Sequence, residues 1–167
     1  MSDDFIMPKN KTKGSKLMPE ILIGKTIHME PLTLSHYEYL RQPANDARIW
    51  TYMPNKANGE FYESWFQDCL LKQMQGIQLT YVIRRIKDNQ LIGTRAYYEI
   101  ELQHKKLEVG YGWLNPAAWG KRYNHESLLL LFQNAFETWD INRVQIATDP
   151  RNVKNYNTLK KLGATKE

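Results

Sequence analysis

The apolar positions between residues 107 and 139 follow two different periods, and the rest of the chain is organised around them. Residues 107–114 form a run of apolar and small residues that is typical of a strand. Residues 123–139 are apolar over a much longer stretch, which predicts a packed helix. Pro116 marks a turn after the strand, and residues 119–124 form a small basic loop that leads directly into the helix.

Shorter runs of alternating apolar and polar residues predict four further strands. Their predicted ranges are 21–31, 79–86, 90–100 and 143–148. The first of them contains a turn at Gly24. Turns at residues 87–89 and 101–106 join three successive strands, so we expect an antiparallel meander that ends with residues 107–114.

Three-four spacing of apolar residues, together with capping and breaking residues, predicts the other helices. Their predicted ranges are 35–41, 59–75 and 153–162. Pro43 is expected to stop the first of these helices and Gly163 to end the last. Cys69 falls on the apolar face of the second, so we interpret it as a small core residue and not as a nucleophile.

The order of these elements is a strand, helices, three strands, a helix, a strand and a helix, which is typical of an α+β domain. We predict a mixed, mostly antiparallel central sheet flanked by helices, formed by residues 20–167. Residues 1–19 are polar, rich in lysine and without a period, so we expect them to be a disordered basic arm.

Composition is that of an ordinary globular domain, since 42% of the 167 residues are hydrophobic and 25% are charged. No apolar run approaches the ~20 residues of a membrane helix, and the first residues lack the apolar segment of a signal peptide. With one cysteine and no metal-ligand spacing around the four histidines, we expect a cytoplasmic protein without a metal site. The net charge of +5 suits an anionic ligand and does not require nucleic acid.

A strand end, a tight loop and the start of a helix follow one another in residues 107–124, and this arrangement is suited to binding anions. The first backbone N–H groups of a helix have no partner within the helix, and the helix dipole adds positive charge there. Lys121 and Arg122 bring two cations to the same place. We therefore interpret the loop as a binding site for a phosphorylated cofactor.

The loop also resembles the pyrophosphate loop of the GNAT N-acetyltransferases, in particular the branch of the ribosomal-protein (Rim-type) acetyltransferases. Many members of that branch carry Trp-Gly-x-Gly-x-Asn. Five of the six positions agree here, namely Trp119, Gly120, Lys121, Tyr123 and Asn124. Arg122 stands at the second glycine, where it would either pair with a phosphate or block the loop. The resemblance extends from about residue 21 to the last residue.

This resemblance implies a GNAT-like fold and transfer of an acetyl group from acetyl-CoA to a primary amine. The acceptor would be a protein N-terminus, an amino-acid-like molecule or a polyamine. The cofactor-binding residues that it implies are Trp113, Leu114, Trp119, Gly120, Lys121, Arg122, Tyr123 and Asn124. The family normally continues with two more strands, so the chain looks truncated at its C-terminus. An open sheet edge would then be available for a homodimer.

Acetyl transfer to an amine needs a neutral amine, a polarised thioester carbonyl and a proton for the departing thiolate. Glu108 is the candidate general base, acting through a water. Strand alternation predicts that it shares one face with Gly110, Gly112 and Leu114, which leaves room for a ligand. The alternative role for Glu108 is an ion pair with a cation such as Arg95.

Asn152 and Asn155 complete the predicted catalytic set. Asn152 matches a family asparagine that contacts the cofactor arm or the acceptor, and it is also suited to cap the helix that follows it. Asn155 lies where the branch usually has a serine close to the cofactor sulfur, but an amide is a poor proton donor. Tyr156 is rotated by about 100° from Asn155 around the helix, so the general acid is unassigned.

Two other functions are consistent with the sequence. The chain could be a GNAT-like module that holds CoA without turnover, or a basic protein that docks on ribosomal RNA through residues 1–18. Residues 50–58 are rich in aromatic and turn residues, and in the resembled family this region helps to build the acceptor pocket. The same residues are equally suited to plug the core beneath a loop.

Overall fold

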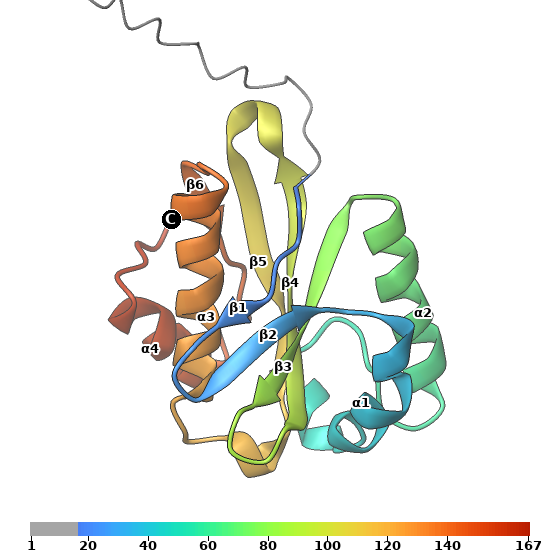
Figure 1. Ribbon diagram of the computed structural model, residues 1–167. Coiled ribbons are helices and arrows are strands. Elements are labelled where there is room, and N and C mark those ends of the chain that lie inside the picture. The colour runs from blue at the N-terminus through green and yellow to red at the C-terminus, as the bar shows by residue number, and fades with distance from the viewer. Residues whose placement is uncertain (1–16) are drawn as a thin grey trace, which may run out of the picture.

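Strands that follow one another along the chain also lie side by side in the computed structural model, which describes residues 17–167 (Figure 1). The strands of this one sheet are β1 (Leu22–Ile23), β2 (Ile27–Pro31), β3 (Gln78–Arg85), β4 (Gln90–Glu101), β5 (Lys106–Leu114) and β6 (Arg143–Gln145). All neighbours are antiparallel except β5 and β6, which are parallel. The predicted mixed, mostly antiparallel sheet is therefore confirmed. Residues 1–16 of the predicted arm lie outside the residues that the structure describes.

The helices divide between the two faces of the sheet (Figure 1). They are α1 (Tyr37–Ala44), α2 (Phe61–Met74), α3 (Tyr123–Gln133) and α4 (Val153–Lys161). Figure 1 shows α1 and α2 on one side of the sheet and α3 on the other, with α4 beyond α3. Short 3-10 turns precede α1 and α3, and a π-helical turn, Asn134–Thr138, extends α3 towards the end that the sequence predicts.

Each face of the sheet has its own hydrophobic core. The core under α3 includes Tyr97, Leu107, Val109, Leu114, Leu128 and Leu131. The core under α1 and α2 includes Leu32, Trp50, Tyr62, Phe66, Cys69 and Trp113. Cys69 is buried there, and this burial raises the pKa of its thiol to about 11, in agreement with the predicted structural role. Because each buried Leu or Phe contributes about 2 kcal/mol, both faces contribute substantially to the stability of the sheet.

Two predicted boundaries are wrong. Pro43 does not stop the first helix but lies inside α1, one residue before its end. Its ring is buried, and its carbonyl, one of those at the helix end that lack a donor within the helix, accepts a hydrogen bond of 3.0 Å from the Asn115 side chain. The strand expected over residues 143–148 ends at Gln145, because β5 and β6 stop pairing at that residue.

Glu126, in the first turns of α3, fastens the β1–β2 hairpin to the helix. Its carboxylate accepts hydrogen bonds from the backbone N–H groups of Lys25 and Thr26 and from the Thr26 hydroxyl. A side chain at Gly24 would collide with the same carboxylate. Partial burial opposes the charged form, but the hydrogen bonds from Thr26, Lys25 and Ile27 outweigh it, so the pKa of Glu126 lies below its ordinary value.

Glu126→Ala should lower the free energy of unfolding by about 2 kcal/mol, since the hairpin loses three charge-assisted hydrogen bonds. Urea denaturation at pH 7 measures this loss, and the exposed Glu137→Ala serves as the control. Because the folded-state pKa is depressed, the stabilisation is present above the ordinary value of 4.5 and is lost as the pH falls through the folded value. An equal pH dependence below 4.5 in wild type and variant would contradict this role.

Candidate functional site

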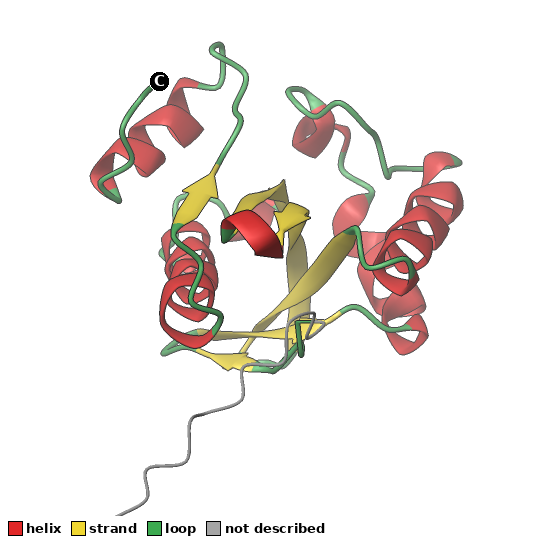
Figure 2. Cartoon of the chain, turned by 90° about the horizontal axis from the view of Figure 1, so that it is seen from above, coloured by secondary structure: helices red, strands yellow, loops and turns green. Residues whose placement is uncertain are grey.

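β5 and β6 pair along only part of their length, and this creates the opening around which the site is built. Their parallel ladder joins Lys106–Glu108 to Arg143–Gln145 and then ends. The chain after β6 leaves the sheet towards α4 (Figure 2). Within residues 17–167, no strand lies beside residues 109–114 of β5 on this side. Their backbone groups on that edge are therefore available to a ligand, except for the Leu114 carbonyl, which accepts a hydrogen bond from the Trp119 indole.

A β-bulge in β5 changes which residues face the opening. Thr94 of β4 pairs with Trp113 of β5, and Ala96 pairs with Gly110. One residue therefore lies between the two pairs on β4, whereas two lie between them on β5. Tyr111 takes up the extra length with a φ of 49°, in the left-handed region. A tyrosine at positive φ is uncommon, and the backbone is locally strained at this position.

The bulge contradicts the prediction that Glu108, Gly110, Gly112 and Leu114 share a face. Leu107 and Val109 pack under α3, so Glu108 and Gly110 face the α1 and α2 side, where Gly110 lies against the Tyr98 ring. After the bulge, the alternation of side chains between the two faces of the sheet is shifted by one residue. Gly112 then lies against the Arg95 guanidinium, and Leu114 belongs to the core under α3.

Glu108, the predicted general base, is half-buried at the last paired position before β5 and β6 separate. It forms a hydrogen bond with the Tyr98 hydroxyl, and burial together with this hydrogen bond raises the pKa of Tyr98. The alternative ion pair with Arg95 is absent from the described residues, because Arg95 points to the other face of the sheet, towards α3. The base role of Glu108 stays a prediction.

The predicted cofactor loop begins at the end of β5. The Trp119 indole N–H donates a hydrogen bond of 2.8 Å to the carbonyl oxygen of Leu114, which folds the loop back onto the strand. Gly120 has a φ of 72°, and no atom lies close to the place of a side chain there. Arg122 has ordinary right-handed dihedrals. Gly120 is therefore the position of this loop whose backbone conformation favours glycine. Arg122, which stands where the resembled family has its second glycine, has a backbone conformation that causes no strain.

Positive charge and free backbone donors meet at the start of α3. Arg122 is the N-cap residue of α3, and no side chain accepts a hydrogen bond there as a cap. Lys121 and Arg122 are exposed beside this end, whereas Tyr123 and Asn124 are half-buried in the first turn. The arrangement therefore offers backbone N–H groups, a helix dipole and two cations to an anion.

The start of α4 lies beside the same loop. The Lys154 ammonium is 5.4 Å from the centroid of the Trp119 ring. The Asn152 side chain accepts a hydrogen bond of 3.2 Å from the backbone N–H of Asn155, so its predicted role as a helix cap is confirmed. The Asn155 amide donates to the Thr148 hydroxyl at 3.0 Å, and this contact fixes its orientation. Catalytic roles for both asparagines stay predictions.

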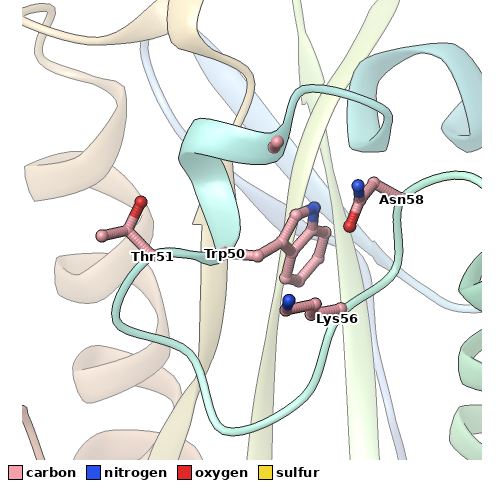
Figure 3. A pocket seen from close by; sticks show the side chains of 5 residues that line it. Trp50, Thr51, Lys56 and Asn58 are labelled. Carbon is pink, nitrogen blue, oxygen red and sulfur yellow. The ribbon is translucent and has the colours of Figure 1, made fainter.

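A pocket of about 200 Å³ opens on the other side of β5, in the loop that was predicted to border the acceptor (Figure 3). It is lined by Ala47, Trp50, Thr51, Lys56 and Asn58. Figure 3 shows the Lys56 and Asn58 side chains beside the Trp50 ring, and the Trp50 ring is 5.6 Å from that of Trp113. The Asn58 side-chain oxygen is buried without a hydrogen-bond partner in the described chain.

Exposed cations surround this pocket and the Trp119 loop. We call Arg48, Lys56, Arg151 and Lys154 the basic rim. Arg48 lies 6.0 Å from the Trp119 ring and Arg151 lies 5.9 Å from the Tyr52 ring. Asp46 and Asp149 pair with the two arginines, so the rim has two more cations than carboxylates. No local sequence pattern reveals the basic rim, because its members are far apart along the chain.

Two kinds of feature are absent from the described part of the chain. No helix in residues 17–167 is long and apolar enough to cross a membrane. No three His, Cys, Asp or Glu side chains in that part of the chain gather closely enough to hold a metal ion.

A family model described as an acetyltransferase (GNAT) domain matches residues 26–165. Among curated proteins, the uncharacterized N-acetyltransferase p20 of Bacillus licheniformis is 28% identical over 79 residues. The matched stretch is 47% of this chain and 44% of p20, so the chain spans less than half the length of this curated relative.

Solved structures share the fold over most of the chain. An acetyltransferase candidate from T. thermophilus has a TM-score of 0.77 at 26% identity, covering 90% of this chain and 78% of that one. RimL, a ribosomal L7/L12 alpha-N-protein acetyltransferase, has a TM-score of 0.74 at 21% identity, covering 88% and 81%. A GNAT-family acetyltransferase from Bacillus anthracis has a TM-score of 0.74 at 20% identity, covering 89% and 85%. The predicted fold is confirmed by these similarities.

Gly120→Ala should lower the free energy of unfolding by about 1 kcal/mol, because alanine resists the left-handed conformation that Gly120 adopts. Urea denaturation followed by tryptophan fluorescence measures the loss. Lys121→Ala, at the next exposed position, is the control and should stay within about 0.5 kcal/mol of wild type. Equal stabilities of the two variants would show that the loop does not hold Gly120 in this conformation.

Proposed function

Because the chain belongs to the GNAT acetyltransferase family, we propose that it transfers the acetyl group of acetyl-CoA to a primary amine. The observation that carries the proposal is the separation of β5 from β6 next to the uncapped start of α3. A strand edge with free backbone groups suits the amide-rich pantetheine arm. A helix N-terminus flanked by cations suits the pyrophosphate.

The residues present fit this co-substrate. We propose that backbone N–H groups of residues 120–124 hold the pyrophosphate, with Lys121 and Arg122 adding charge at its exposed side. Leu114 would contact the arm through its backbone N–H at the end of the open strand edge, since its carbonyl already accepts a hydrogen bond from Trp119, and Trp113 would lie beside this contact. Gly120 leaves space for a phosphate to approach the loop, because no atom of the protein fills the place of its missing side chain.

Acetyl transfer would proceed by direct attack of the amine nitrogen on the thioester carbon. The new C–N bond forms as the C–S bond breaks, and the amine loses one proton while the departing thiolate takes up one. We propose that Glu108 receives the amine proton through a water, from its half-buried position where β5 and β6 part. Backbone N–H groups near the Tyr111 bulge would hydrogen-bond the carbonyl oxygen as it gains charge.

The asparagines of α4 would orient groups rather than transfer protons. Asn152 is occupied as a helix cap, and Asn155 donates to Thr148, so both side chains are held in place. A fixed amide can hydrogen-bond a thiolate but does not protonate it. The proton for the departing sulfur would come from water.

The basic rim favours an acceptor with negative charge close to its amine. Its excess of cations would repel a polyamine, whereas it would attract the acidic residues that follow a protein N-terminus. RimL acts on a ribosomal protein, and a structure from Vibrio cholerae with the same fold is described as a candidate ribosomal-protein-serine acetyltransferase. We therefore propose a protein N-terminus followed by acidic residues as the acceptor.

Acetyl-CoA should bind the full chain with a micromolar dissociation constant in calorimetry. Glu108→Gln should leave this affinity unchanged and lower kcat about a hundredfold, because the base is lost while the binding groups remain. Glu99→Gln, at an exposed position of β4, is the control and should keep full activity. A folded wild-type chain that releases no heat with acetyl-CoA would refute the proposal. Binding without turnover on any amine would favour a module that only holds CoA.

Acceptor preference should follow the charge of the residues after the N-terminus. A peptide with acidic residues at its second to fifth positions should have about a tenfold higher kcat/KM at low salt than a lysine-containing counterpart with the same first residue. The difference should shrink as the ionic strength rises.

The double variant Lys56→Glu and Lys154→Glu should reduce this preference, because it reverses two charges of the basic rim. Lys160→Glu, exposed near the other end of α4, is the matched control and should not. Equal rates for the two peptides, or a higher rate for spermidine, would contradict the acidic acceptor.

A further inference from the structure

Arg95 on β4 is a charged side chain in the interior, and only 6% of it is exposed. Its Nε donates a hydrogen bond of 3.1 Å to the Ser127 hydroxyl, and its Nη2 donates one of 2.5 Å to the side-chain oxygen of Asn124. The guanidinium crosses β5 at Gly112, where a side chain would lie 2.5 Å from Nη1. Arg95 therefore extends from the sheet to the first turns of α3, beneath the loop proposed to hold the pyrophosphate.

The surroundings of Arg95 provide no negative charge. In residues 17–167 it forms no ion pair, and both of its hydrogen-bond acceptors are neutral. Burial lowers the pKa of the guanidinium to about 10, so the group keeps its charge at neutral pH. Other arginines of the sheet differ in this respect, since Arg84 pairs with Glu30.

The position of Arg95 makes its charge still less favourable in the free protein. Asn124 and Ser127 belong to the first turns of α3, which is the positive end of the helix dipole. A buried cation without a counter-ion costs several kcal/mol, and a neutral side chain of similar size would avoid that cost. An anion bound at the start of α3 would offset both the dipole and the buried charge.

We propose that Arg95 is a positioning residue for the phosphate groups of the co-substrate, which supply the counter-charge that the protein lacks. The proposal rests on acetyl-CoA binding at the start of α3. Arg95 acts from below, by fixing Asn124 and by adding a positive charge that water does not screen. Lys121 and Arg122 act from the exposed side, where salt screens them.

Arg95→Met tests the role of the charge, because methionine fills much of the same space without charge. The melting temperature of the free variant should equal or exceed that of wild type, since the buried charge is gone. Its affinity for acetyl-CoA in calorimetry should fall at least tenfold. Inorganic pyrophosphate should raise the melting temperature of wild type more than that of the variant.

Arg95→Lys keeps the charge and should retain affinity within about threefold of wild type. Arg84→Met is the matched control, because it removes an arginine from an ion pair on the neighbouring strand. It should lower the melting temperature, since Glu30 loses its arginine partner, and leave the affinity for acetyl-CoA unchanged.

The outcomes separate this role from a purely structural one. A lower melting temperature and equal losses of affinity in the Met and Lys variants would show that Arg95 only holds α3 against the sheet. Unchanged affinity in Arg95→Met would also overturn the proposal while leaving acetyl-CoA binding intact. Absence of binding by wild type, in contrast, would remove the proposed function itself together with this role.

Discussion

The parallel strands β5 and β6 pair over three residues and then separate, and this separation has two consequences for the candidate site. Residues 109–114 lose a neighbour on one edge, which exposes backbone donors and acceptors that an intact sheet would satisfy internally. The chain that follows β6 is also free to carry α4 back over the loop at the end of β5, where Lys154 meets Trp119. The candidate site depends on this separation, because continued pairing with β6 would occupy the backbone groups along this edge of β5.

The electrostatics of the free protein are unbalanced at the same place. Arg95 is buried without a carboxylate, the start of α3 has no side-chain cap, and Lys121 and Arg122 are exposed beside it. Elsewhere in the described residues, partly buried charges are compensated, as in the pair of Arg84 with Glu30 and the hydrogen bonds to Glu126. Local imbalance in an otherwise compensated structure is the physical signature expected of a site that is completed by an anionic ligand.

Local patterns were sufficient for most of the fold, and they were insufficient where distant residues meet. Alternation and turn residues predict the β3–β4–β5 meander, and the capping preference of asparagine predicts the role of Asn152. The bulge at Tyr111 has no such signal, because tyrosine rarely adopts a positive φ and nothing nearby marks an extra residue. Strand alternation therefore gave the wrong face for Gly112. The contacts of Arg95 with Asn124 and Ser127 join residues about thirty positions apart, which no local period reveals.

The end of β5 borders both cores, and one strand can therefore serve two half-sites. Neighbouring residues at the end of β5 point into different cores, Trp113 towards the pocket beside Trp50 and Leu114 towards α3. The pocket beside Trp50 and the loop proposed to hold the pyrophosphate both adjoin this strand end, since Trp50 contacts Trp113 and Trp119 donates to the Leu114 carbonyl. In the proposed reaction, the acetyl group would pass between them along the strand edge that β6 leaves uncovered. The rigidity of the two cores would then hold donor and acceptor in register, while the open edge between them leaves space for the reaction.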